Sequence, residues 1–158
     1  MLSLIRSLKM ETATKNNYKT LLDEMYKNVK MGADSIVNVM PSVEDKTIRE
    51  ELTAQLERYG EYAHKIEDIL YSDGSSPKEE NMITKISSKL GIKFNTMMDS
   101  TSTHIAQMII EGATMGVTNM TRLLREYENT SCPEKILSLA RDIIEYEEAT
   151  IETMKKFL

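Results

Sequence analysis

Apolar residues recur at intervals of three and four along most of this chain of 158 residues, and this period constrains the fold more than any other feature. An α-helix turns once in about 3.6 residues, so such spacing gathers apolar side chains on one face. Four stretches carry the pattern, at about 14–40, 45–71, 77–128 and 131–158, and the third has a break or kink near Gly91. We found no strand-like alternation of useful length. The sequence therefore predicts an all-α protein.

The stretches are long and the breaks between them are short, which favours one domain spanning residues 1–158 and folded as an antiparallel four-helix bundle. A long coiled-coil hairpin is the alternative, but the apolar faces are wider than a two-stranded seam requires. Asp45 is a predicted N-cap, and Pro133 suits the first position of the last helix. Residues 72–81, SDGSSPKEEN, form the clearest predicted loop.

The inward faces contain several residues that are unusual for a helical core. Gly112 and Gly116 lie one turn apart on the third stretch, and Gly32 on the first stretch is also inward. Glycine in a helix costs about 1 kcal/mol relative to alanine, so we expect another backbone to approach closely there. A groove left for a ligand is the alternative. The chain also has twelve methionines, and those at 25, 40, 98, 108 and 154 predict an adaptable apolar core.

The motif Glu61-x-x-His64 raises the question of a metal site, because Glu-x-x-His on a helix is half of a di-iron site in some bundles. At about 100° per residue, Glu61 lies about 170° and His64 about 130° from the inward direction of its helix. Both therefore face solvent. Glu147 is the one carboxylate that falls within a predicted core face. Its expected partner is a polar neighbour such as Thr101, Asn119, Thr150 or a tyrosine hydroxyl, and the alternative is a position near the end of the core where the carboxylate stays hydrated.

Glu147 and His104, which lies on the flank of its helix, are the remaining metal candidates. One inward carboxylate does not make a di-iron centre, since hard metal ions need several converging ligands. The sequence shows no catalytic constellation and no cofactor motif, so it does not indicate an enzyme.

Composition narrows the remaining classes of function. The formal charge is −5 and no basic block occurs, so nothing favours nucleic acid. No stretch approaches the length of a membrane span. The single cysteine, Cys132, excludes an internal disulfide and fits a reducing, cytoplasmic compartment. Residues 1–13 predict a short helical arm that packs on the body of the protein or on a second subunit, with a membrane-surface anchor as the weaker alternative.

Three segments carry a resemblance to a known family: YKNVKMGADSIVNVMP at 26–41, EELTAQLERYGEYA at 50–63 and STHIAQMIIEGATMGVTNMTRLLREYEN at 102–129. The chain resembles an uncharacterised ferritin-like four-helix family of clostridia-like bacteria. The resemblance covers nearly the whole chain. It implies a long crossover between the second and third helices, at residues 72–91, and it brings no established activity. Only Glu147 matches the metal motif of that superfamily in type and orientation.

Two functions are expected. The first is a non-catalytic cytoplasmic scaffold or interaction protein, expected to be a homo-oligomer or to bind a protein partner. The second is a bundle that binds a metal ion or a small ligand at an internal site near Glu147.

Overall fold

The computed structural model describes the backbone of residues 1–77 and 100–158, and the side chains of these residues except 10–17. This part of the chain is helical and contains no strand, which confirms the all-α prediction. The α-helices are α1 (Leu2–Val39), α2 (Lys46–Ser72), α4 (Ser102–Tyr127) and α5 (Glu134–Met154). Two short 3₁₀ helices follow α1 and α5, namely η1 (Met40–Ser42) and η2 (Lys155–Phe157).

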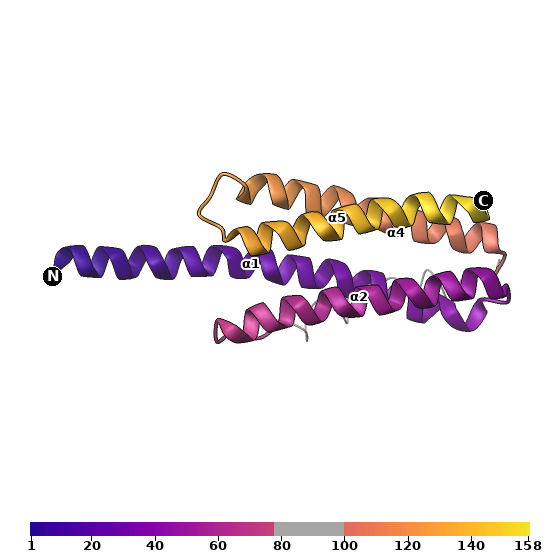
Figure 1. Cartoon of the computed structure of the whole chain (residues 1–158), viewed down its shortest axis with the longest axis horizontal. Coiled ribbons are helices and arrows are strands. Elements are labelled where there is room, and N and C mark those ends of the chain that lie inside the picture. Colours follow the sequence, from indigo (N-terminus) through magenta and orange to yellow (C-terminus); the bar gives the residue numbers. More distant parts are fainter. Residues whose placement is uncertain (78–99) are drawn as a thin grey trace.

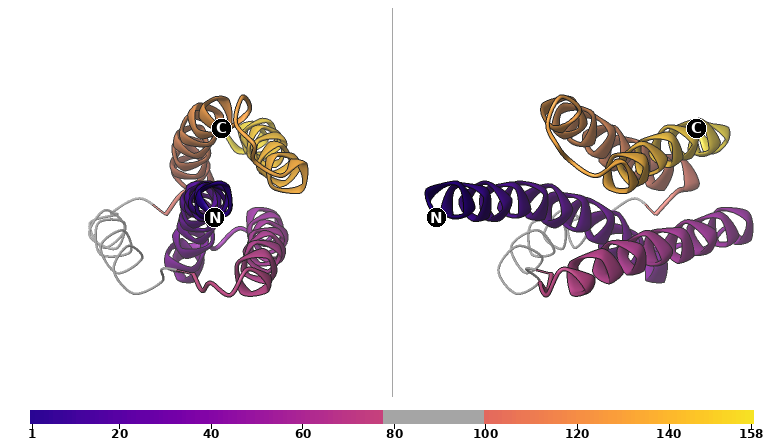
Figure 2. Two further views of the ribbon diagram at one scale, coloured as in Figure 1. Left: turned by 90° about the vertical axis from the view of Figure 1, so that its left-hand side faces the viewer. Right: turned by 60° about the vertical axis from the view of Figure 1, so that its left-hand side comes forward.

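The four α-helices lie roughly along one axis (Figure 1). α1 and α5 run in one direction, and α2 and α4 run in the other (Figure 1). α1 packs against α2 and α4, and α4 packs against α5. Figure 2, viewed along the axis, shows the pair α4–α5 beside the pair α1–α2. The buried apolar residues of all four helices form one continuous cluster.

Side chains at the helix ends explain several of the boundaries. The Asp45 carboxylate accepts hydrogen bonds from the backbone amides of Thr47 (2.8 Å) and Ile48 (3.1 Å), which confirms the predicted N-cap of α2. At the other end of α2, Gly74 has a positive φ of 75°, and the amide of Ser75 donates to the carbonyl of Leu70 at 2.8 Å. This is a Schellman closure, in which glycine adopts the left-handed conformation without a steric penalty.

The third predicted stretch, 77–128, is not one continuous helix, because residues 100 and 101 are not helical. α4 begins at Ser102, because Thr101 has an extended backbone and its side chain accepts a hydrogen bond from the His104 amide at 3.3 Å. Thr101 is therefore an N-cap and not an inward residue. The predicted kink at Gly91 and the predicted crossover beyond residue 77 lie outside the described residues.

The predicted N-terminal arm is helical, but it is continuous with α1 and does not pack on the body of the protein. Figure 1 shows the first part of α1 extending past the ends of the other three helices. Leu2, Leu4, Ile5 and Leu8 are 85, 66, 47 and 55% exposed. This part of α1 has passed the ends of α2, α4 and α5, so it has no apolar surface of these three helices to contact (Figure 1). The prediction of packing on the body is therefore wrong.

In α1, α2 and α5, most of the apolar residues that recur at intervals of three and four are buried, as the spacing predicts. The buried face of α4, in contrast, is rotated from the one that the spacing predicts. Gly112 and Asn119 were predicted inward and are exposed, whereas Ala113 and Met120 are buried. The apolar face of α4 is wider than the surface that α1 and α5 cover, and its uncovered edge faces a cavity. Met25 and Met154 are fully buried, as expected, while Met98 lies outside the described residues.

The predicted close approach at Gly32 involves a ring and not a backbone. A Cβ atom added to Gly32 would lie 2.5 Å from Cζ and 2.8 Å from Cε1 of Tyr59. Tyr59 is 4% exposed and packs edge-on against Tyr146, with ring centroids 5.7 Å apart. The absence of a side chain at position 32 therefore makes room for a ring that has little freedom to move.

We predict that Gly32→Ala destabilises the protein by about 1–3 kcal/mol, because overpacking outweighs the gain in helix propensity. Gly60→Ala is the matched control, since no atom of the described residues lies within 4 Å of a Cβ added there. That control should stabilise the protein by up to about 1 kcal/mol. Urea unfolding measures both. Equal stabilisation by the two substitutions would contradict the contact with Tyr59.

Candidate functional site

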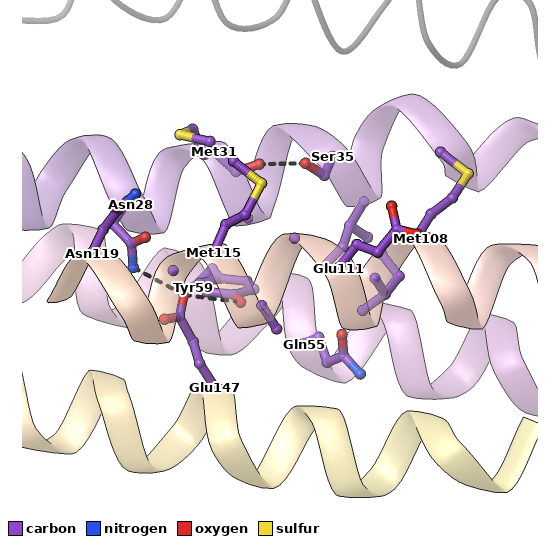
Figure 3. A pocket seen from close by; sticks show the side chains of 16 residues that line it. Asn28, Met31, Ser35, Gln55, Tyr59, Met108, Glu111, Met115, Asn119 and Glu147 are labelled. Carbon is purple, nitrogen blue, oxygen red and sulfur yellow. Dashed lines mark hydrogen bonds between the residues drawn. The ribbon is translucent and has the colours of Figure 1, made fainter. Parts of the chain in front are cut away.

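A cavity of about 120 Å³ lies among α1, α2 and α4, with one residue of α5 at its base. Figure 3 shows its lining, with Met31 near the top of the view, Met115 and Tyr59 below it, and Glu147 lowest. Its walls are largely apolar, and they include Met31, Ile36, Met108, Ile109, Ala113 and Met115. Polar side chains gather at Glu147, Tyr59, Asn28, Asn119 and Gln55. The cavity thus combines an apolar wall with a few polar groups, as small-molecule sites do.

Glu147 is the most unusual group in the cavity. Its side chain is 2% exposed, and its Oε1 accepts hydrogen bonds from Asn28 Nδ2 at 2.9 Å and from the Tyr59 hydroxyl at 3.4 Å. Its Oε2 is buried and accepts no hydrogen bond from the described residues. A buried carboxylate oxygen without a donor is costly. This atom therefore marks a place where a bound molecule could lower the free energy of the protein.

Burial raises the pKa of Glu147 from 4.5 to about 7, although the hydrogen bonds from Asn28 and Tyr59 oppose the shift. A charged carboxylate loses its hydration when it is buried, and two neutral donors replace only part of it. Near neutral pH the group is consequently divided between its protonated and ionised forms.

A cluster of aromatic rings holds Tyr59 in place behind Glu147. Tyr146 contacts Tyr59 edge-on and also contacts Tyr62, with 5.7 Å between the centroids of each pair. The guanidinium of Arg58 lies 5.1 Å from the Tyr62 ring centroid on the outer side. Burial and the neighbouring Glu147 carboxylate raise the pKa of Tyr59 well above 10. Tyr59 is therefore a hydrogen-bond donor to Glu147 at every ordinary pH.

Gln55 supplies a second unpartnered acceptor. It is 1% exposed, and its Nε2 donates to Glu51 Oε1 at 2.9 Å and contacts Met154 Sδ at 3.3 Å. Its Oε1 is buried and accepts no hydrogen bond from the residues that the structure describes. Gln55 and Glu147 both line the cavity, so both of these residues with an unpartnered oxygen border the same space.

The two glycines of α4 shape the site in different ways. A Cβ added to Gly116 would lie 2.6 Å from Oε2 of Glu147, so this glycine makes room for the carboxylate. A Cβ added to Gly112 would meet no described atom within 4 Å. The predicted backbone contact at these glycines is wrong, and Gly112 lies instead in the wall of an open space.

The structure places the candidate metal ligands apart. His104 is half-buried near the start of α4 and does not line the cavity. Gly116, which contacts Glu147, is twelve residues further along the helix, or about 18 Å away. Glu61 and His64 are exposed, as predicted. Within residues 1–77 and 100–158, no group of three or more His, Cys, Asp or Glu side chains could hold a metal ion.

Sequence reasoning identified Glu147 as buried and anticipated a tyrosine hydroxyl as its partner, but it missed Asn28 and Gln55. Asn28 neighbours the apolar residue Val29 at the edge of the inward face of α1, and Gln55 precedes the apolar Leu56 on α2. A polar residue at the boundary of an apolar face is ordinarily solvated. Only the relative rotation of the helices shows which of these residues point inward.

No helix in the described part of the chain is both long enough and apolar enough to cross a membrane.

Comparison of the chain with protein-family models, with curated proteins and with solved structures gives no match in any of the three. The geometry of the cavity is therefore the basis for inferring a function.

We predict that ionisation of Glu147 destabilises the folded protein. Because its pKa is 4.5 unfolded and about 7 folded, its contribution is fully present below pH 4.5 and is lost as the pH rises through 7. Relative to Glu147→Gln, the free energy of unfolding of the natural protein should fall by about 3 kcal/mol across that window. Urea titrations at several pH values measure it.

Glu148→Gln serves as the control for that measurement, because Glu148 is the next residue along α5 and is exposed. It should leave the pH dependence in place. If Glu147→Gln leaves it in place too, Glu147 is not the titrating group.

Proposed function

We propose that this protein is a non-catalytic helical bundle that binds a small organic molecule in the cavity beside Glu147. The observation that carries the proposal is the buried Oε2 of Glu147, a residue that lines the cavity, because this atom has no hydrogen-bond donor from the described residues. Gln55 Oε1 supports it in the same way. A ligand that donates hydrogen bonds would satisfy these atoms, and the apolar wall would cover the rest of its surface.

The same features favour an organic ligand over a metal ion. Hard cations are held by several oxygen ligands, and Glu147 is the one buried carboxylate among the cavity residues that are described. Most of the wall is made of methionine, isoleucine, alanine and glycine, which supply no oxygen ligand from their side chains.

We also propose that the four helices form a bundle with ferritin-like connectivity. α1 and α2 form one antiparallel pair, and α4 and α5 form another (Figure 1). The end of α2 and the start of α4 lie at opposite ends of the bundle (Figure 1). A single long crossover between two antiparallel pairs is the ferritin-like arrangement.

A screen for small molecules that bind in the cavity tests the proposed function. Molecules of about four to six non-hydrogen atoms are screened by thermal unfolding, because a ligand that binds only the folded state raises the melting temperature with concentration. At least one should do so. Gly112→Leu, which adds a side chain at the open wall, should reduce that shift by more than half.

Gly60→Leu is the matched control, since Gly60 is a helical glycine with open space around it that does not line the cavity. It should bind the same molecules as the natural protein. A screen without hits would contradict the function, and equal binding by Gly112→Leu would contradict the location.

The exposed first part of α1 supports a second proposal, that this chain forms homo-oligomers. Leu4 and Leu8 lie one helical turn apart and are both more than half exposed, and Ile5, three residues before Leu8, is 47% exposed. A second copy could bury these side chains. An apolar stripe of this kind on a projecting helix is typical of a helix–helix contact.

We expect the double substitution Leu4→Gln and Leu8→Gln to weaken self-association at least about tenfold. Each copy would then lose two apolar side chains that the interface between copies buries. The control pair, Arg6→Gln with Lys9→Gln, changes polar residues of the same segment and should have little effect. Light scattering at several protein concentrations measures the association. A monomer at all concentrations for the natural protein would rule out this second proposal.

A further inference from the structure

The charges around the cavity indicate the sign of its ligand. Glu147, which lines the cavity, is acidic and only 2% exposed, and none of the described residues that line the cavity is Lys, Arg or His. The pKa shift of Glu147 has burial as its main cause, with no cationic group among those causes. A cation would therefore be the missing partner of the carboxylate.

The unsatisfied atoms indicate what the cation must carry. Oε2 of Glu147 and Oε1 of Gln55 are acceptors, and both belong to side chains that are at least 98% buried, with 2% and 1% exposed. Acceptors need N–H or O–H donors, and a donor that carries positive charge forms the stronger hydrogen bond with a carboxylate. A quaternary ammonium ion has no such donor, whereas a primary ammonium ion has three.

The size of the cavity and its apolar wall indicate what the ligand carries besides its charged group. An apolar cavity of about 150 Å³ accommodates benzene, so about 120 Å³ suits roughly four to six non-hydrogen atoms. Met31, Met108 and Met115 offer flexible apolar surface at the sides, and flexible methionines adapt to an alkyl group.

We propose that the ligand is a primary alkylammonium ion of about this size, with its ammonium group on the Glu147 carboxylate and its alkyl group against the methionines. This inference rests on the proposed function, because it names the class of molecule that the same cavity binds.

The groups that face Glu147 determine how binding depends on pH. Asn28 from α1 and Tyr59 from α2 donate to it, and Gly116 of α4 lies against it. Of these three residues only Tyr59 titrates, and its pKa lies well above 10. Glu111, which also lines the cavity, is exposed. Ionisation of Glu147 on raising the pH therefore creates the charge that an ammonium ion requires, while the ammonium ion keeps its proton.

Isothermal titration of the natural protein with n-butylammonium, tetramethylammonium, butan-1-ol and butyrate tests the inference. n-Butylammonium should bind most tightly, and its affinity should rise at least about tenfold between about pH 5.5 and pH 8, as Glu147 ionises. The affinity for butan-1-ol should not rise. Glu147→Gln should weaken n-butylammonium binding at least about tenfold, and Glu148→Gln should leave it unchanged.

The outcomes separate this inference from the proposed function. Preferential binding of butan-1-ol or butyrate would overturn the ammonium assignment and leave a small-molecule cavity in place. Tighter binding of tetramethylammonium would overturn the requirement for donors. If none of the four binds and the broader screen also fails, the proposed function fails with it. The ligand series and the pH dependence need only the natural protein, so they decide the matter even if Glu147→Gln folds poorly.

Discussion

A carboxylate buried without a cation among the described residues is the constraint around which the interior of this protein is arranged. Burying Glu147 is unfavourable unless its oxygens are satisfied, and the described residues satisfy only Oε1. The neighbouring elements adapt to it. Gly116 gives the carboxylate space, Gly32 gives space to the Tyr59 ring, and Tyr146 fixes that ring from the side. Well-packed apolar residues would be more stable here, so the arrangement favours a role in binding.

The cavity is bordered by a further glycine of α4, Gly112. Helices pack closely where large side chains from each interlock, as α1 does with α2 and α4 does with α5. Gly112 faces open space, and the methionines beside it are flexible enough to leave room. Polar acceptors at the base of an apolar space then give the cavity a chemical preference.

Much of the fold could be predicted from periodicity and helix caps, since both depend on neighbours in the sequence. Asp45 caps α2 as expected, and the inward face of α5, with Glu147 on it, was predicted correctly. The prediction from apolar periodicity was wrong at α4. It extended the helix beyond the Thr101 cap and placed Gly112 inward, because an apolar face does not reveal how much of it a neighbour covers. For the same reason the sequence did not show that Leu4, Ile5 and Leu8 of the arm are exposed, whereas its helical conformation was predicted correctly.

The sequence by itself determined that this chain is helical, where most of the described helices end, and that one carboxylate lies among apolar residues of α5. These properties depend on local spacing and on backbone hydrogen bonds near the helix ends. Only the tertiary structure decided that Asn28 and Tyr59 meet Glu147 and that Gln55 shares its cavity. Residues 28, 59 and 147 come from three different helices. Their meeting depends on the relative rotation and separation of those helices, which no local pattern encodes.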